Sequence, residues 1–206
     1  MIQKFGTKHW RRQKNLPTKE IIGLIGTHPG VGVTYTGLML AFYMGEECGK
    51  QTAYLECNDH QDMIAIYSSY QWKKEEEDSF FFHRVTCYPQ VTSDQIPAIM
   101  NEDYDCIIID FGCDYQSSKE ELLRCHKKIV IGGRASWEGV SLLNFWDETK
   151  ALPGGLSWQY FIPQASNKLI KEVKKEVKRE ISAVPFIEEP VLPSKVINQF
   201  FQRIFD

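Results

Sequence analysis

The stretch Ile21–Thr36 decides the fold: it reads IIGLIGTHPGVGVTYT, an apolar run, a glycine-rich loop and the start of a second apolar segment. An apolar run that leads through glycines into a helix is the outline of a phosphate-binding loop, G-x-x-x-x-G-K-[ST]. Backbone N–H groups of such a loop surround phosphates, its lysine neutralises their charge, and its Ser or Thr holds Mg²⁺. Gly30, Gly32 and Thr34 stand where this pattern requires them, but Val33 occupies the position of the lysine. The sequence therefore predicts a phosphate-site architecture without its main cation.

The composition restricts the class of protein. A chain of 206 residues with a net charge of −3 suits one domain and has no general attraction to nucleic acid or membrane. No apolar run approaches the length of a transmembrane helix, and the basic N-terminus lacks the apolar core of a secretion signal. We expect a cytoplasmic protein in which residues 1–20 form a basic arm and residues 21–206 a single domain. The arm is expected to be solvated, with contact to an acidic partner, anionic lipid or nucleic acid as the alternative.

Cysteine usage adds no metal or redox motif. The six cysteines are scattered and none forms C-x-x-C, so neither a zinc ribbon nor a thioredoxin-type motif is indicated. Several lie in apolar runs, where a free thiol behaves as a small hydrophobic side chain. We therefore expect reduced cysteines in the core.

After residue 20 the chain alternates apolar runs of strand length with segments of helical length. We expect strands at 21–25, 52–56, 80–87, 105–110, 128–131, 158–162 and 181–186, and helices at 31–48, 61–72, 93–100, 118–126, 137–149, 168–179 and 194–205. A charged surface turn is expected at 73–78. Near-continuous apolar strands separated by helices predict an α/β fold, in which a mostly parallel sheet carries helices on both faces in three layers.

The predicted sheet places three segments at one edge. Ligands of such sheets lie beyond the carboxyl ends of the strands, which are the positions of residues 26–34, 56–60 and 110–114. These segments resemble those of the MinD/ParA family of deviant-Walker-A P-loop ATPases. The family's loop, G-K-G-G-V-G-K-T, corresponds to THPGVGVT at 27–34, its D-x-D to ECN at 56–58, and its Walker B strand to CIIID at 106–110. Segments 128–134, 158–164 and 184–186 follow in the family's order, so the resemblance covers residues 21–205.

The departures from the family pattern concern charge. Val33 replaces the lysine that contacts the β- and γ-phosphates, and His28 replaces the signature lysine that reaches across the family's dimer. Asn58 replaces the catalytic aspartate, and Pro29 removes one backbone N–H from the loop. Phosphoryl transfer depends on positioned charge, and losing a single such contact commonly costs about 10²–10³ in rate. We therefore expect ATP hydrolysis to be lost, and we assign no catalytic residue.

The resemblance nevertheless implies a nucleotide site and a metal site. Thr34 and Asp110 are the pair that would organise Mg²⁺, and Gln164 stands where an asparagine reads the base. The implied cofactor is ATP or ADP with Mg²⁺, weakly held. The residues implied in nucleotide binding are His28, Gly30, Val31, Gly32, Val33, Thr34, Tyr35 and Gln164.

Three functions follow from these observations. The leading hypothesis is a pseudo-ATPase that acts as an assembly, positioning or regulatory adaptor through protein partners, with a homodimer as the family implies; TadZ-like pilus-assembly proteins are the branch it resembles. The first alternative is an active Mg-dependent ATPase whose cation comes from elsewhere, for example from Arg134. The second is a metal or redox site at the strand ends. That site would draw on His28, Glu56, Cys57, His60, Asp110 and Cys113.

Two helices raise the question of anionic partners. The last helix carries a wide apolar stripe, which predicts packing on the sheet more than binding at a membrane surface, because only Lys195 and Arg203 flank it. The helix at 168–179 separates its charges, which suits an anionic partner such as DNA better than alternating ion pairs would. We nevertheless expect a solvated face, because four lysines on one helix are common. Its basic face comprises Lys171, Lys174, Lys175 and Lys178, and its acidic stripe comprises Glu172, Glu176 and Glu180.

Overall fold

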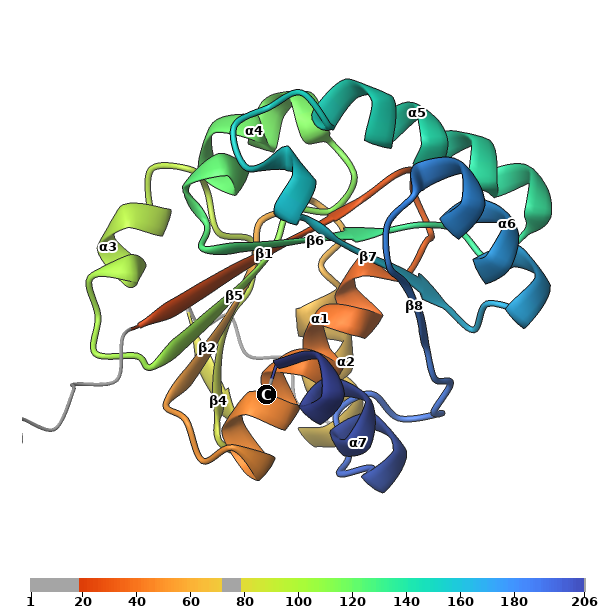
Figure 1. The fold of residues 1–206 in the computed structure, drawn as a ribbon. Helices are drawn as coiled ribbons and strands as arrows, with labels where there is room; N and C mark the ends of the chain where they lie inside the picture. Colours follow the sequence, from red (N-terminus) through yellow and green to blue (C-terminus); the bar gives the residue numbers. More distant parts are fainter. Residues whose placement is uncertain (1–18, 72–78, 206) are drawn as a thin grey trace, which may run out of the picture.

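A computed structural model of the chain describes residues 19–71 and 79–205. Most of the expected basic arm, residues 1–18, and the expected charged turn at 73–78 lie outside the described residues. Eight strands form one sheet in the order β3-β4-β2-β5-β1-β6-β7-β8 (Figure 1). The strands are β1 (Glu20–Gly26), β2 (Thr52–Glu56), β3 (Phe80–Phe82), β4 (Val85–Tyr88), β5 (Cys106–Asp110), β6 (Lys127–Ile131), β7 (Gln159–Pro163) and β8 (Ile181–Val184).

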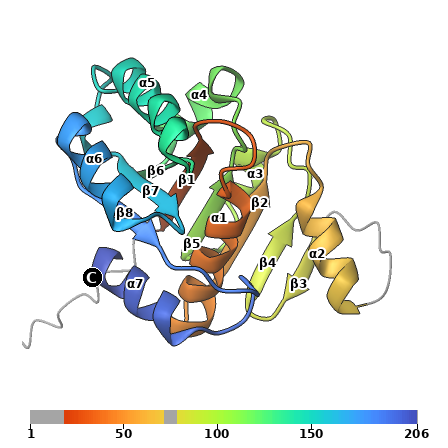
Figure 2. The same cartoon turned by 90° about the vertical axis from the view of Figure 1, so that its right-hand side faces the viewer.

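The sheet is parallel throughout except at β3, which confirms the predicted fold class. Its central strand β1 pairs with β5 on one side and β6 on the other, and the strands are apolar on both faces because helices cover both. One face carries α3 (Ile96–Met100), α4 (Tyr115–Arg124), α5 (Gly139–Thr149) and α6 (Asn167–Val177), and the other carries α1 (Val33–Phe42), α2 (Asp62–Gln71) and α7 (Lys195–Phe205) (Figures 1 and 2). Short turns of helix lie at η1 (Tyr43–Glu47), η2 (Ser136–Glu138) and η3 (Gly155–Ser157).

The prediction of a single strand over 80–87 is wrong. The segment folds back as an antiparallel hairpin in which Phe80 pairs with Cys87 and Phe82 with Val85. His83 takes the positive φ of 54° that the turn needs, although turns of this kind usually carry glycine or asparagine there. The polar pair His83-Arg84 interrupts the apolar run at this turn, but neither residue is a usual turn former.

The last helix packs on the sheet, as its apolar stripe predicted. Helix α7 buries Ile197, Phe200 and Phe201, and the Phe200 ring lies 5.6 Å from that of Phe161 in β7. Among the described residues, no helix is both long enough and apolar enough to cross a membrane. The apolar stripe therefore closes the layer that also contains α1.

The predicted first helix also differs in its limits. It begins at Val33 rather than residue 31, because Gly32 adopts a left-handed conformation just before it. Its last turn, η1, is wound as a π-helix from Tyr43 to Glu47. The late start leaves residues 27–32 as a loop at the carboxyl end of β1.

Candidate functional site

The glycine-rich loop joins the end of β1 to the start of α1 at the carboxyl edge of the sheet. Gly30 and Gly32 have φ angles of 81° and 94°, a left-handed conformation that glycine adopts without steric cost. Gly32 is the N-cap of α1 and supplies no side-chain cap, so the first N–H groups of the helix keep no intrahelical partner. A Cβ at Gly26 would lie 2.8 Å from the Val33 side chain, so strand and loop approach as only glycine allows. The backbone thus has the form of an anion-binding loop.

The position of the missing lysine is filled by a core residue. Val33 is 8% exposed and Val31 is 7% exposed, and both belong to the apolar cluster under α1. The loop therefore substitutes packing for the cation that normally faces the phosphates. This feature preserves the architecture of the loop while removing its charge.

Thr34 and Asp110 form the contact expected of a metal-organising pair. The Thr34 hydroxyl donates to Asp110 Oδ2 at 2.7 Å, and the Gly112 N–H donates to Oδ1 at 2.8 Å. Sequence reasoning missed a third donor, the Tyr54 hydroxyl, which reaches the same Oδ2 at 2.8 Å. Burial raises the pKa of Asp110, and these three hydrogen bonds act in the opposite direction. Tyr54 is itself fully buried, and burial raises its pKa well above the ordinary value.

Magnesium fits this pair. Thr34 lines a cavity of 210 Å³ beside the loop and can offer its hydroxyl oxygen, while Asp110, fully buried behind it, fixes the orientation of that hydroxyl. Mg²⁺ takes few protein ligands and keeps several waters, so a hydroxyl ligand with a carboxylate behind it fits the ion. When bound, Mg²⁺ would neutralise part of the phosphate charge.

A second buried carboxylate stands next to Asp110. Glu56, the last residue of β2, pairs in register with Asp110 and is fully buried. Its Oε1 accepts from the Met63 N–H at 3.2 Å, while Oε2 has no hydrogen-bond partner. Burial, with smaller contributions from the nearby carboxyl groups of Asp110 and Asp62, raises the pKa of Glu56 to about 7. Two carboxyl groups are therefore buried next to each other, and burial favours their neutral forms.

His28, at the position of the signature lysine, is engaged within the chain. Its imidazole contacts the Thr27 hydroxyl at 3.1 Å and Glu138 Oε1 at 3.2 Å. The other oxygen of Glu138 accepts from the Ala135 N–H at 2.7 Å, and this hydrogen bond and His28 together lower the pKa of Glu138. Sequence reasoning missed Glu138, which lies far from the loop along the chain.

The remaining predicted residues lie around a neighbouring cavity of 550 Å³. Gln164 accepts a hydrogen bond from the Arg134 guanidinium, and both line this cavity with the loop glycines. Tyr35 also lines it, but its hydroxyl is bound to the chain: it donates to the Ile187 carbonyl at 2.6 Å and accepts from the Ile187 N–H at 2.8 Å. Trp137, at the same cavity, is 79% exposed.

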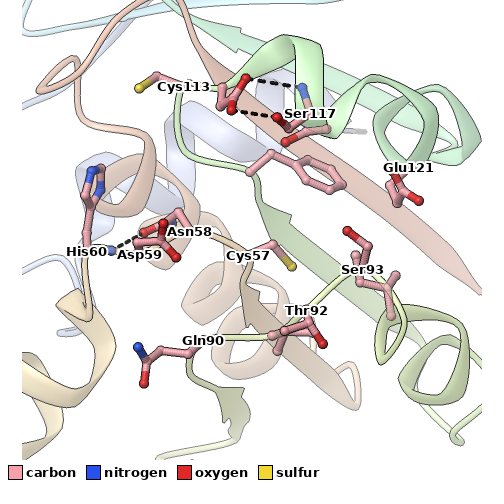
Figure 3. Close-up of a pocket in the computed structure, with 15 residues that line it drawn as sticks. Cys57, Asn58, Asp59, His60, Gln90, Thr92, Ser93, Cys113, Ser117 and Glu121 are labelled. Carbon is pink, nitrogen blue, oxygen red and sulfur yellow. Dashed lines mark hydrogen bonds between the residues drawn. The ribbon is translucent and has the colours of Figure 1, made fainter.

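A third cavity, of 490 Å³, lies along the same edge of the sheet (Figure 3). It shares His60 and Cys113 with the 210 Å³ cavity. Its wall holds Asn58, whose Oδ1 accepts from the His60 N–H at 3.0 Å and whose amide nitrogen is buried without a partner. Asp114 is occupied as the N-cap of α4, where its side chain accepts hydrogen bonds from Ser117. The three predicted edge segments therefore do meet.

The alternative of a metal or redox site is not favoured by the described residues. No group of three or more His, Cys, Asp or Glu side chains in the described part of the chain is placed to hold a metal ion. His28 is bound to Glu138, and burial raises the pKa of the Cys57 and Cys113 thiols. Because the thiolate is the reactive form, raised pKa values oppose redox chemistry here.

Solved structures place this fold among known proteins. A putative plasmid partition protein from Borrelia burgdorferi, bound to AMPPNP, aligns with a TM-score of 0.68 and 13% identity over 91% of this chain and 97% of that one. A chain of the MinC:MinD cell division protein complex from Aquifex aeolicus aligns with a TM-score of 0.68 and 11% identity, over 91% of this chain and 96% of that chain. MinD from Pyrococcus horikoshii, complexed with Mg-ADP, aligns with a TM-score of 0.60 and 14% identity. The alignment covers 89% of this chain and 93% of that chain.

The chain thus has the fold of the ParA/MinD P-loop ATPases, as the sequence resemblance predicted. No protein-family model matches the sequence, and no curated protein matches it. At these identities the structural likeness defines the fold, and function has to be argued from the site.

Proposed function

We propose that this chain is a degenerate ParA/MinD-type P-loop protein that acts as an assembly, positioning or regulatory adaptor and has lost ATP hydrolysis. The observation that carries the proposal is Val33, a buried core side chain at the position where an ATPase of this type keeps its phosphate-binding lysine. The loop around it keeps its left-handed glycines and its open helix terminus. A chain that retains the shape of the phosphate-binding loop without its lysine suits a binding role better than catalysis.

The other catalytic positions support the same reading. His28 is held by Glu138 within its own chain, which takes it away from a role in a partner's site. Asn58 carries no charge and places its Oδ1 on the His60 N–H. Arg134, the cation that an active ATPase would need, donates to Gln164 on the side of the loop away from Asp110. Each position that supplies catalytic charge in this fold is therefore neutral or engaged.

The adaptor would bind through exposed apolar side chains. Trp137 and Phe186 are 79% and 60% exposed, and we take these two large aromatic side chains as the first candidate contacts. We propose protein partners, a homodimer included, with ATP or ADP and Mg²⁺ as a weakly held structural ligand. MinD bound to MinC is a precedent within the fold. We also propose one cytoplasmic domain over residues 21–206 and a basic arm over residues 1–20.

ATP turnover by the purified full chain tests the loss of activity. We expect no Mg²⁺-dependent phosphate release above that of an Asp110→Ala variant. Turnover that exceeds this control and disappears in Arg134→Gln would overturn the proposal in favour of an ATPase with a displaced cation. Affinity capture of the tagged chain tests the adaptor role separately, with Trp137→Ser and Phe186→Ser as surface variants. Loss of captured partners in these variants would support the role. Capture that is unchanged in both variants would contradict the proposed surface.

A further inference from the structure

One edge of the sheet is open at β8. Strand β8 is the last in the strand order, and within the described residues it pairs only with β7. The Gln164 N–H donates to the Val184 carbonyl, so the backbone groups of Val184 point towards β7. Because the direction of these groups alternates along a strand, those of Ala183 point away from the sheet. Ala183 thus presents its N–H and its carbonyl to an added strand.

The residues of β8 do little to protect this edge. Edge strands of natural proteins commonly carry lysine, proline or an inward-pointing charge, or are covered by a helix or loop. The strand reads ISAV, without a charged residue or a proline, and Ser182 and Ala183 are partly exposed. Helices α6 and α7 lie on opposite faces of the sheet beside β8 and leave the edge between them (Figures 1 and 2). Pro185 follows the strand and marks the end of the open edge.

A cavity beside the open edge can receive a side chain. It measures 360 Å³, lies between β8 and α7, and is lined by Ser182, Ala183, Phe200, Arg203 and Ile204. Its wall therefore combines apolar surface with one guanidinium. An added strand directs alternate side chains to the two faces of the sheet, so one of them can enter this cavity.

Positive charge flanks the open edge on both faces. On the α7 side, Arg203 Nε donates to the Gln199 carbonyl at 3.1 Å, and among the described residues Arg203 forms no ion pair. On the α6 side, Lys174 Nζ lies 2.6 Å from the carboxylate of Glu180, the residue just before β8, and both side chains are exposed. An exposed pair of this kind contributes little, so Lys174 can exchange its partner for another carboxylate. Lys178, the C-cap of α6, adds a further cation shortly before the strand.

We propose that the open edge of β8 binds an extended, acidic segment of a protein partner as an added strand. The backbone groups of Ala183 pair with the segment, and Arg203 and Lys174 bind its carboxylates. The cavity beside Phe200 takes one of its apolar side chains. The exposed Phe186 lies just beyond the end of this edge, so the proposal deepens the adaptor role proposed above, on which it rests, by naming the chemistry of one partner.

Fluorescence anisotropy of the full chain with three labelled peptides of about ten residues tests this proposal. One peptide alternates valine with glutamate, the second alternates proline with glutamate, and the third alternates valine with lysine. We expect the valine–glutamate peptide to bind about tenfold tighter than either of the others. The reason is that it alone combines negative charge with a backbone that can pair as a strand.

Two variants locate the binding. Ala183→Pro removes the outward N–H, which an edge strand tolerates, and should weaken binding of the valine–glutamate peptide about tenfold while the circular dichroism spectrum stays unchanged. Arg203→Glu reverses an exposed charge without touching the backbone and should weaken binding about fivefold. Arg124→Glu is the matched control, because it reverses an exposed arginine on α4, away from β8, and should leave binding unchanged (Figure 1).

Equal binding of the two glutamate peptides would overturn the proposal, because charge alone would then explain the interaction. Binding that is unchanged in both Ala183→Pro and Arg203→Glu would overturn it too, as would dissociation constants weaker than about 1 mM for all three peptides. Duplex DNA that binds more tightly than any peptide, and does so in Ala183→Pro but not in Lys174→Glu, would assign the basic face of α6 to nucleic acid and overturn it as well. Each of these outcomes leaves the adaptor role to the capture experiment with Trp137→Ser, so the two proposals fail separately.

Discussion

The Tyr54 hydroxyl donates a 2.8 Å hydrogen bond to Asp110 Oδ2, the oxygen that also accepts from Thr34. Tyr54 and Asp110 are fully buried, so the bond lies where water cannot replace a lost donor. Removing one partner of such a buried bond costs about 1–3 kcal/mol. We expect Tyr54→Phe to lower the free energy of unfolding by that amount, as measured by urea denaturation at pH 7.

Tyr115→Phe is the control for this variant. The Tyr115 hydroxyl is also buried but has no hydrogen-bond partner, so its removal should change stability by no more than about 0.5 kcal/mol, or raise it. Equal losses in the two variants would show that the Tyr54–Asp110 bond has no specific contribution.

Glu56 makes stability depend on pH. Burial raises its folded-state pKa from 4.5 to about 7, while the unfolded chain keeps the ordinary value. Between these pH values the folded state holds a proton that the unfolded state releases, so the free energy of unfolding falls as pH rises. Glu56→Gln removes this titration. Between pH 4.5 and pH 8 we therefore expect the free energy of unfolding of the variant, relative to that of the unchanged chain, to rise by an amount on the order of 3 kcal/mol.

Urea midpoints at pH 5, 6, 7 and 8 measure this effect. The raised pKa of Asp110 acts in the same direction and remains in the variant. The fall of the urea midpoint with pH should therefore become smaller in Glu56→Gln without disappearing. A slope identical to that of the unchanged chain would contradict the assignment to Glu56.

Val33→Lys returns the missing cation to the loop. A lysine here adds a charge-assisted contact to the terminal phosphates, and we expect ATP affinity to rise at least tenfold, about 1.4 kcal/mol. Because Val33 is buried, the same change should cost about 1–3 kcal/mol of stability. Titration calorimetry with ATP and Mg²⁺ measures the affinity. Val31→Lys is the control: it disturbs an equally buried site and should lose stability without gaining affinity for ATP. A gain in ATP affinity in both variants would show that the added positive charge acts nonspecifically.

Asp110→Ala separates an adaptor from an enzyme. The substitution leaves Thr34, Tyr54 and the Gly112 N–H without their acceptor, so we expect a loss of about 3–5 kcal/mol in stability. Partner capture at a temperature where the variant stays folded should nevertheless persist. Loss of all partners from a folded variant, verified by circular dichroism, would favour a nucleotide-driven cycle.

The sheet was predictable from the sequence because strands covered on both faces are almost uniformly apolar, as at residues 106–109 of β5. The edge segments followed from strand order alone, since parallel strands end at the same side. The hairpin at His83 was not predictable, because its turn uses no glycine or asparagine. The contacts of Tyr54 with Asp110 and of His28 with Glu138 join residues 56 and 110 positions apart, and no local pattern encodes them.

The two faces of α7 give the last prediction. Phe201 is fully buried, and its ring lies 5.5 Å from Tyr43 and 5.1 Å from Phe200, whereas Val196 on the same helix is 55% exposed. Truncating a buried phenylalanine costs about 3–5 kcal/mol, so Phe201→Ala should strongly lower the urea midpoint and Val196→Ala should leave it nearly unchanged. A membrane-surface helix would behave differently: Phe201→Ala would abolish sedimentation with anionic vesicles at little cost in stability. We expect no vesicle binding by the described domain, because the phenylalanines that would enter the lipid already close the layer over β7.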